Sequence, residues 1–136
     1  MYDLGLKDKV ILITGGSDGL GYASAELLSS EGAHVVICGR RGDYLNEKAK
    51  IITEKTSNEV LPIKADVSNP DDCKKLVEGT IAKYKKIDVL VNNAGASAAA
   101  LFEDVTDKNW EDDINLKLMS IISRRYSFVA SICIPF

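Results

Sequence analysis

A glycine-rich run between two apolar segments constrains the fold of this chain more than any other feature. Residues 10–13 are a short apolar segment typical of a buried strand, residues 14–21 read Thr-Gly-Gly-Ser-Asp-Gly-Leu-Gly, and residues 22–30 are typical of a helix. Glycine has no Cβ and tolerates positive φ, so such a run turns tightly and brings its backbone close to another group. The helix that follows directs its first N–H groups and the positive end of its dipole toward the same place. The run therefore predicts a phosphate site, although a plain strand-to-helix turn is the alternative.

The rest of the chain continues this alternation of strand and helix. Apolar segments typical of strands occupy residues 9–13, 33–38, 60–65 and 87–91. Patterns typical of helices occupy residues 22–30, 43–55, 70–84 and 107–122. Gly32 is expected to follow the first helix in a left-handed conformation, and Asn69 to cap the third with Pro70 at its first position. Such alternation builds right-handed βαβ units, so we predict an α/β fold with a three-layer, doubly wound parallel sheet.

Three further motifs lie along the chain after the glycine run. Asp66-Val67 follows the third strand, the run Asn92-Asn93-Ala94-Gly95 follows the fourth, and Asn115 comes about twenty residues later. Together with the glycine run, these motifs in this order resemble the short-chain dehydrogenase/reductase family of single-domain, NAD(P)-dependent oxidoreductases. The resemblance covers roughly residues 5–121 and implies a Rossmann-like fold with the strand order 3-2-1-4.

The resemblance also implies where a dinucleotide cofactor would lie. The glycine run would cradle its phosphates, Asp66 and Val67 would contact adenine, and the run 92–95 would close the floor under the ribose. Asp66 could instead merely begin a turn, and the run 92–95 could be a loop without a ligand. The predicted cofactor-binding residues are Gly15, Gly16, Ser17, Asp18, Gly19, Leu20, Gly21, Arg40, Arg41, Asp66, Val67, Asn92, Asn93, Ala94 and Gly95.

The segment Gly39-Arg40-Arg41 decides which dinucleotide is expected. In NAD-specific members of the family, an acidic residue at the end of the second strand binds the adenine-ribose 2′-hydroxyl, and here that position is Gly39. Arg40 and Arg41 follow, and guanidinium groups make charge-assisted contacts to phosphate, although a solvated pair of loop arginines is the alternative. Asp18 argues against NADP(H), because NADP-binding members of the family often carry Lys or Arg at this position, just before the second glycine of the motif. We predict NADP(H) in preference to NAD(H).

Asn115 is the one residue that the resemblance marks for a catalytic role. The corresponding Asn of the family holds a water that relays protons to the active-site Lys; a solvent-facing or kink-stabilising helix residue is the alternative. In the family, a Ser and a Tyr-x-x-x-Lys pair follow a fifth strand, and the Tyr protonates the substrate oxygen. Here the one Tyr with Lys four residues later is Tyr44, with Lys48, on the second predicted helix.

Two functions therefore remain open. The resemblance implies an NADP(H)-dependent oxidoreductase that interconverts a small-molecule carbonyl and alcohol, similar to a 3-oxoacyl-thioester reductase, with the chain as written inactive. The alternative is a non-catalytic nucleotide-binding fragment or a vestigial product. The resemblance fades near residue 122, so we expect an incomplete NAD(P)-binding domain over residues 1–122, truncated after the fourth strand and its helix. Residues 123–136 are expected to be an atypical tail, from a shifted reading frame, alternative splicing or a degenerate gene.

Composition narrows the partners. The net charge of −3 argues against a general nucleic-acid binder, and no apolar run approaches the length of a membrane span. Cys38, Cys73 and Cys133 form no CxxC pair and are expected to be thiols in a reducing cytoplasm. His34 is the single histidine, so no metal site is expected. The resemblance implies that full-length members usually assemble through the last predicted helix and the helix after it, so a homo-oligomer is one expectation for this chain and a monomer the alternative.

Overall fold

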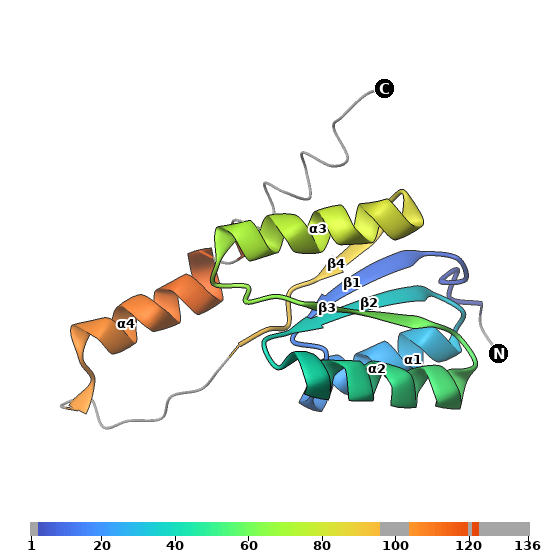
Figure 1. Ribbon diagram of the computed structural model, residues 1–136, viewed down its shortest axis with the longest axis horizontal. Coiled ribbons are helices and arrows are strands. Elements are labelled where there is room, and N and C mark those ends of the chain that lie inside the picture. Colours follow the sequence, from blue (N-terminus) through green and yellow to red (C-terminus); the bar gives the residue numbers. More distant parts are fainter. Residues whose placement is uncertain (1–2, 96–103, 120, 123–136) are drawn as a thin grey trace.

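Four parallel strands form the centre of the molecule, in the order β3-β2-β1-β4 (Figure 1). The computed structural model describes residues 3–95, 104–119 and 121–122. The strands are β1 (Val10–Thr14), β2 (His34–Gly39), β3 (Val60–Lys64) and β4 (Val89–Val91). All three pairings are parallel, with Leu12 of β1 opposite Val36 of β2 and Leu90 of β4. The predicted α/β class and strand order are confirmed.

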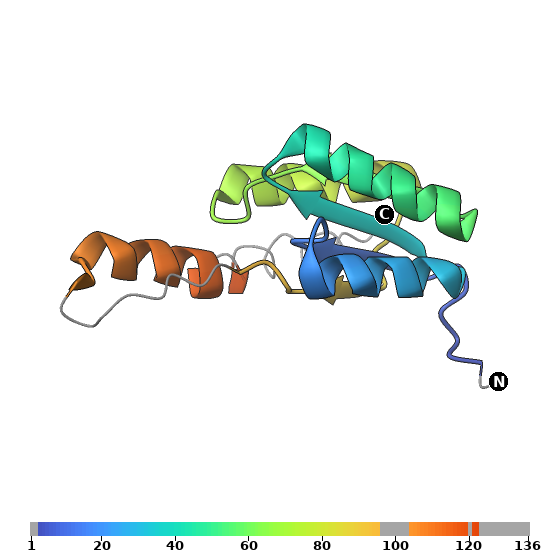
Figure 2. The ribbon, with the colours of Figure 1, turned by 90° about the horizontal axis from the view of Figure 1, so that it is seen from below.

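Helices cover both faces of this sheet. The helices are α1 (Gly19–Ser30), α2 (Gly42–Thr56), α3 (Pro70–Tyr84) and α4 (Asp107–Ile114), and a π-helical segment (Asn115–Met119) follows α4. Side chains alternate between faces along a strand, so Ile11 and Ile13 pack on the α1 and α2 side while Leu12 packs on the α3 side. Figures 1 and 2 show α1 and α2 together on one face and α3 on the other.

The predicted helix ends match local chemistry. Gly32 has φ +84° directly after the last turn of α1, a left-handed conformation that suits glycine. The side chain of Asn69 accepts hydrogen bonds from the backbone N–H groups of Asp71 and Asp72, and Pro70 occupies the first turn of α3. These contacts start α3 immediately after the loop that carries Asp66. Local sequence therefore fixes the length of the loop at the end of β3.

The helix predicted over residues 107–122 differs in its second half. It begins with a capping box between Thr106 and Asn109, is α-helical to Ile114, and widens into the π-helical segment at Asn115. Both views show α4 beyond the carboxyl ends of the strands, and no residue of α4 is buried. The predicted tail, residues 123–136, lies outside the described residues. Within the described residues, no helix has the length and apolar character needed to cross a membrane.

Candidate functional site

A cleft of about 670 Å³ opens where the carboxyl ends of the parallel strands meet. Its volume is in the range of small-molecule and cofactor sites, and its place in the sheet is the one where open α/β sheets bind ligands. The structure brings most of the predicted residues together in its lining. They are Gly15, Ser17, Asp18, Gly19, Leu20, Arg40, Arg41, Asp66, Val67, Asn93, Ala94 and Gly95.

Three of the predicted cofactor-binding residues do not line this cleft. Gly16 donates its N–H to the carbonyl of Cys38 at 3.1 Å, which ties the glycine loop to β2. A Cβ on Gly21 would lie 2.3 Å from the carbonyl oxygen of Gly15, so glycine is needed there for packing. Asn92 is exposed beside its motif partner Asn93. Gly16 and Gly21 thus hold the glycine loop in position without lining the cleft.

The start of α1 provides a place for an anion. Gly19 has φ +54°, and a Cβ built on it would meet nothing within 4 Å, so the backbone is open here. Asp18 is the N-cap residue, yet its side chain makes no capping hydrogen bond. The first N–H groups of a helix have no partner within the helix, and here the N-cap side chain does not take them. Such donors have the chemistry to bind a phosphate group, and the phosphate site stays a prediction.

A buried threonine joins the glycine loop to the loop after β4. Thr14 ends β1 and is fully buried, and its Oγ1 accepts the backbone N–H groups of Asn93 and Ala94, both at 3.0 Å. The Asn93 side chain returns two hydrogen bonds, to the carbonyls of Thr14 at 3.1 Å and Gly15 at 3.0 Å. The cleft therefore has a fixed floor. The sequence prediction omitted Thr14, although a polar residue at the end of an apolar strand was a usable signal.

The two arginines of the loop after β2 have different surroundings. Nη2 of Arg41 donates to Oδ2 of Asp18 at 2.7 Å, and its guanidinium carbon lies 4.1 Å from the ring centroid of Tyr44. The hydroxyl of Tyr44 donates to the other carboxylate oxygen of Asp18. Arg40 lies nearer Asp66, whose carboxylate its charge helps to stabilise. Tyr44 was not predicted as a site residue, because its contact with the glycine loop depends on the fold.

Asp66 makes the contacts of a turn and also lies in the cleft lining, while its predicted contact with adenine stays a prediction. Its Oδ1 accepts hydrogen bonds from the hydroxyl and the N–H of Ser68, at 2.6 and 2.9 Å, as in a turn. It also lines the cleft. The hydrogen bonds from Ser68 and the charge of Arg40 lower the pKa of Asp66, and partial burial opposes them. The cleft thus keeps an ionised acceptor at the end of β3.

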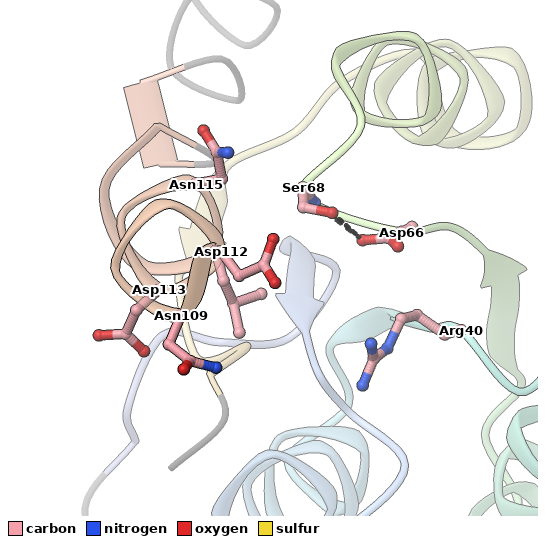
Figure 3. Close-up of a pocket in the computed structure, with 8 residues that line it drawn as sticks. Arg40, Asp66, Ser68, Asn109, Asp112, Asp113 and Asn115 are labelled. Carbon is pink, nitrogen blue, oxygen red and sulfur yellow. Dashed lines mark hydrogen bonds between the residues drawn. The ribbon is translucent and has the colours of Figure 1, made fainter. Parts of the chain in front are cut away.

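Asn115 lies in a second pocket beside the cleft. This pocket has a volume of about 480 Å³, and Figure 3 shows the Asp112 side chain pointing across it toward Ser68 and Asp66, whereas the Asn115 amide points away from Arg40. Arg40, Asp66 and Leu116 line both pockets. Asn115 begins the π-helical segment, and such segments often occur at functional sites. Its catalytic role stays a prediction. In the described part of the chain, no cluster of His, Cys, Asp and Glu could hold a metal ion.

Sequence comparison identifies the family. The family model for short chain dehydrogenases matches residues 9–131, nearly the whole chain. The chain therefore belongs to the short-chain dehydrogenase family. The match runs past residue 122, where the sequence predicted a boundary, and that boundary stays a prediction.

Relatives and solved structures agree with this assignment. The chain is 42% identical over 102 residues to 11-beta-hydroxysteroid dehydrogenase 1A of Arabidopsis thaliana, covering 75% of this chain and 29% of the relative. It is 37% identical over 116 residues to the 3-oxoacyl-[acyl-carrier-protein] reductase FabG of Chlamydia trachomatis, covering 85% and 47%. L-Sorbose reductase from Gluconobacter frateurii, solved with NADPH and L-sorbose, superposes with a TM-score of 0.91 at 34% identity, over 96% of this chain and 50% of that one. The chain thus spans half or less of the length of these three proteins.

Proposed function

We propose that this chain binds NADP(H) in the cleft at the carboxyl ends of its strands, as the cofactor-binding part of an oxidoreductase that interconverts a carbonyl and an alcohol. The observation that carries the proposal is the pair Arg40 and Arg41 in the cleft lining, at the end of a strand that carries Gly39 in place of an acidic residue. The L-sorbose reductase that resembles this chain was solved with NADPH. A 2′-phosphate would find cationic groups there, and no carboxylate at position 39 to repel it.

The residues of the chain fit the remaining parts of such a cofactor. The first N–H groups of α1 would bind the pyrophosphate, and Asp66 with Val67 would contact adenine at the end of β3. Asn93 holds the glycine loop and the loop after β4 in one geometry, so the cleft is preorganised. When bound, the nicotinamide supplies or accepts hydride.

Turnover is a separate question from binding. Tyr44 and Lys48 lie on α2, and the Tyr44 hydroxyl is bonded to Asp18 of the glycine loop, so this pair is not positioned beside Asn115. We propose that the chain as written binds the cofactor without reducing a carbonyl by the family's mechanism. A small-molecule substrate, a homo-oligomer and a cytoplasmic location stay predictions.

Calorimetric titration of the full chain with NADPH and NADH tests this proposal. We expect NADPH to bind at least about tenfold more tightly, since each charge-assisted contact to the phosphate contributes about 1.5 kcal/mol. Replacing both arginines, Arg40→Gln with Arg41→Gln, should remove that preference and leave NADH affinity within about twofold. Replacing two exposed lysines of α2 away from the cleft, Lys50→Gln with Lys55→Gln, is the matched control for lost charge. Failure of both nucleotides to bind would contradict the proposal. NADPH oxidation in the presence of ketones or aldehydes would contradict the proposed lack of turnover.

A further inference from the structure

We propose that Asp18 is a specificity-determining residue of the cleft, which restrains recognition of a 2′-phosphate by holding Arg41 in an ion pair. The preference for NADP(H) over NAD(H) is then smaller than two unrestrained arginines would give. This inference rests on the proposed function, because it concerns the same cofactor site.

The Asp18 carboxylate does not cap the helix that it precedes. An aspartate at an N-cap ordinarily accepts a hydrogen bond from the backbone at the start of its helix. Asp18 makes no such bond; its carboxylate turns toward the loop after β2. There Oδ2 accepts from Nη2 of Arg41 at 2.7 Å, and Oδ1 accepts from the hydroxyl of Tyr44. Both oxygens are therefore committed to groups outside the helix that Asp18 begins.

The side chains of Asp18, Arg41 and Tyr44 hold one another in position. Tyr44 donates to Asp18 and also lies under the Arg41 guanidinium, whose carbon is 4.1 Å from the ring centroid. The three residues come from three different segments: the glycine loop, the loop after β2 and the first turn of α2. We call them the Asp18 cluster. Arg41 is thus restrained on two sides, by an ion pair and by a ring.

The ion pair between Asp18 and Arg41 reduces the attraction of Arg41 for a phosphate. Asp18 and Arg41 both line the cleft, so a 2′-phosphate that reaches Arg41 comes close to the Asp18 carboxylate. To contact Arg41, the phosphate must compete with the Asp18 carboxylate for the same guanidinium, and the loss of that ion pair weakens phosphate binding. Arg40 is not part of the Asp18 cluster and remains the main phosphate contact. Asp18 and Arg41 are each more than half exposed, so water screens the effect and keeps it modest.

Two nucleotides that differ only in the 2′-phosphate isolate this effect. We would titrate the full chain with 2′,5′-ADP and with 5′-AMP by calorimetry. Asp18→Asn keeps the shape of the side chain and removes its charge. It should tighten 2′,5′-ADP binding about fivefold more than it tightens 5′-AMP binding, which is the size of an exposed ion pair. The matched control is Asp43→Asn, which removes an exposed charge in the first turn of α2 outside the cleft lining and should change neither affinity more than about twofold.

A second background separates the ion pair from simple repulsion. In an Arg41→Gln chain, Asp18→Asn should change 2′,5′-ADP affinity less than about twofold, because the pair it releases is already gone. If Asp18→Asn leaves the ratio of the two affinities unchanged, or tightens 2′,5′-ADP equally in both backgrounds, the inference is overturned while the proposed function stands. If the unaltered chain binds neither nucleotide, both are overturned.

Discussion

The sheet has two lateral halves: the covered side, formed by β1, β2 and β3, and the β4 side, formed by β4 and the segments after it. These two sides differ in how completely their apolar residues are covered. On one side, every residue of β1 is buried, β2 pairs with both its neighbours over five residues each, and helices pack on both faces. On the other, β4 has three residues, Val89 is exposed, and α4 has no buried residue. The cleft at the carboxyl ends of the strands is built mainly by the covered side. The strands and helices around the glycine loop therefore bury their apolar side chains against one another, whereas the apolar side chains after β4 are left at the surface of the described structure.

The largest expected effect tests this contrast with one leucine from each side. Leu12 is fully buried in the central strand, so Leu12→Ala should reduce the free energy of unfolding by about 3 kcal/mol. Leu118 in the π-helical segment is 55% exposed, so Leu118→Ala should change it by less than about 0.5 kcal/mol. Urea unfolding followed by circular dichroism measures both. A loss of several kcal/mol for Leu118→Ala would break the comparison, because it would mean that this side is covered in solution.

The covered side is also the part that the sequence predicted best. Its strands are continuous apolar segments, and its helix ends carry local signals such as Gly32 and the Asn69-Pro70 pair. These depend on residues close together in the chain. Strand order was correct because it came with the resemblance to a known family.

Contacts between distant segments could not be predicted in this way. The bonds between Thr14 and Asn93 join residues 79 positions apart, and Tyr44 meets Asp18 across 26 positions. The π-helical segment at Asn115 was also missed, since the spacing of apolar residues over 107–122 fits an ordinary helix. The cleft residues followed from motifs, and the bonds that fix their positions required the structure.

The second largest effect concerns how the glycine loop is packed. Gly21→Ala would place a Cβ 2.3 Å from the Gly15 carbonyl oxygen and 2.4 Å from Nδ2 of Asn93, so backbone must move. We expect a loss of about 1–3 kcal/mol in unfolding free energy, together with loss of NADPH binding. Gly79→Ala in α3 is the control: its Cβ would meet only the end of the Ile63 side chain, at 3.1 Å, and alanine favours a helix. It should stay within about 1 kcal/mol and bind NADPH normally. Equal effects from the two variants would refute the packing role of Gly21.

A smaller effect is expected where the two sides of the sheet are joined. Asn93→Ala removes both side-chain hydrogen bonds to the carbonyls of Thr14 and Gly15, so we expect a loss of about 1–2 kcal/mol and weaker NADPH binding. Asn46→Ala, on the exposed surface of α2, should change stability by less than about 0.5 kcal/mol. Thermal unfolding with and without NADPH measures both. If Asn93→Ala unfolds like the unaltered chain and gains the same stabilisation from NADPH, the joint between the two loops does not order the cleft.

The smallest effect separates two aspartates, one on each side, whose pKa values are both lowered. The hydrogen bonds from Ser68 lower the pKa of Asp66, and the bond from the Val10 N–H is the main cause for Asp88 before β4. A carboxyl whose pKa is lower in the folded chain contributes stability above its unfolded pKa, and that contribution is lost as the pH falls through the folded value. The loss of stability of the whole chain in acid includes the contributions of both aspartates, so it cannot be assigned to either one.

Ser68→Ala removes the principal cause of the lowered pKa of Asp66 and leaves Asp88 unchanged. It should therefore lower the unfolding free energy at pH 7 by less than about 1 kcal/mol, and the difference from the unaltered chain should shrink toward zero in acid, where Asp66 is protonated in both states. A difference that stays constant from neutral to acidic pH would show that Ser68 acts on the turn and not through the charge of Asp66.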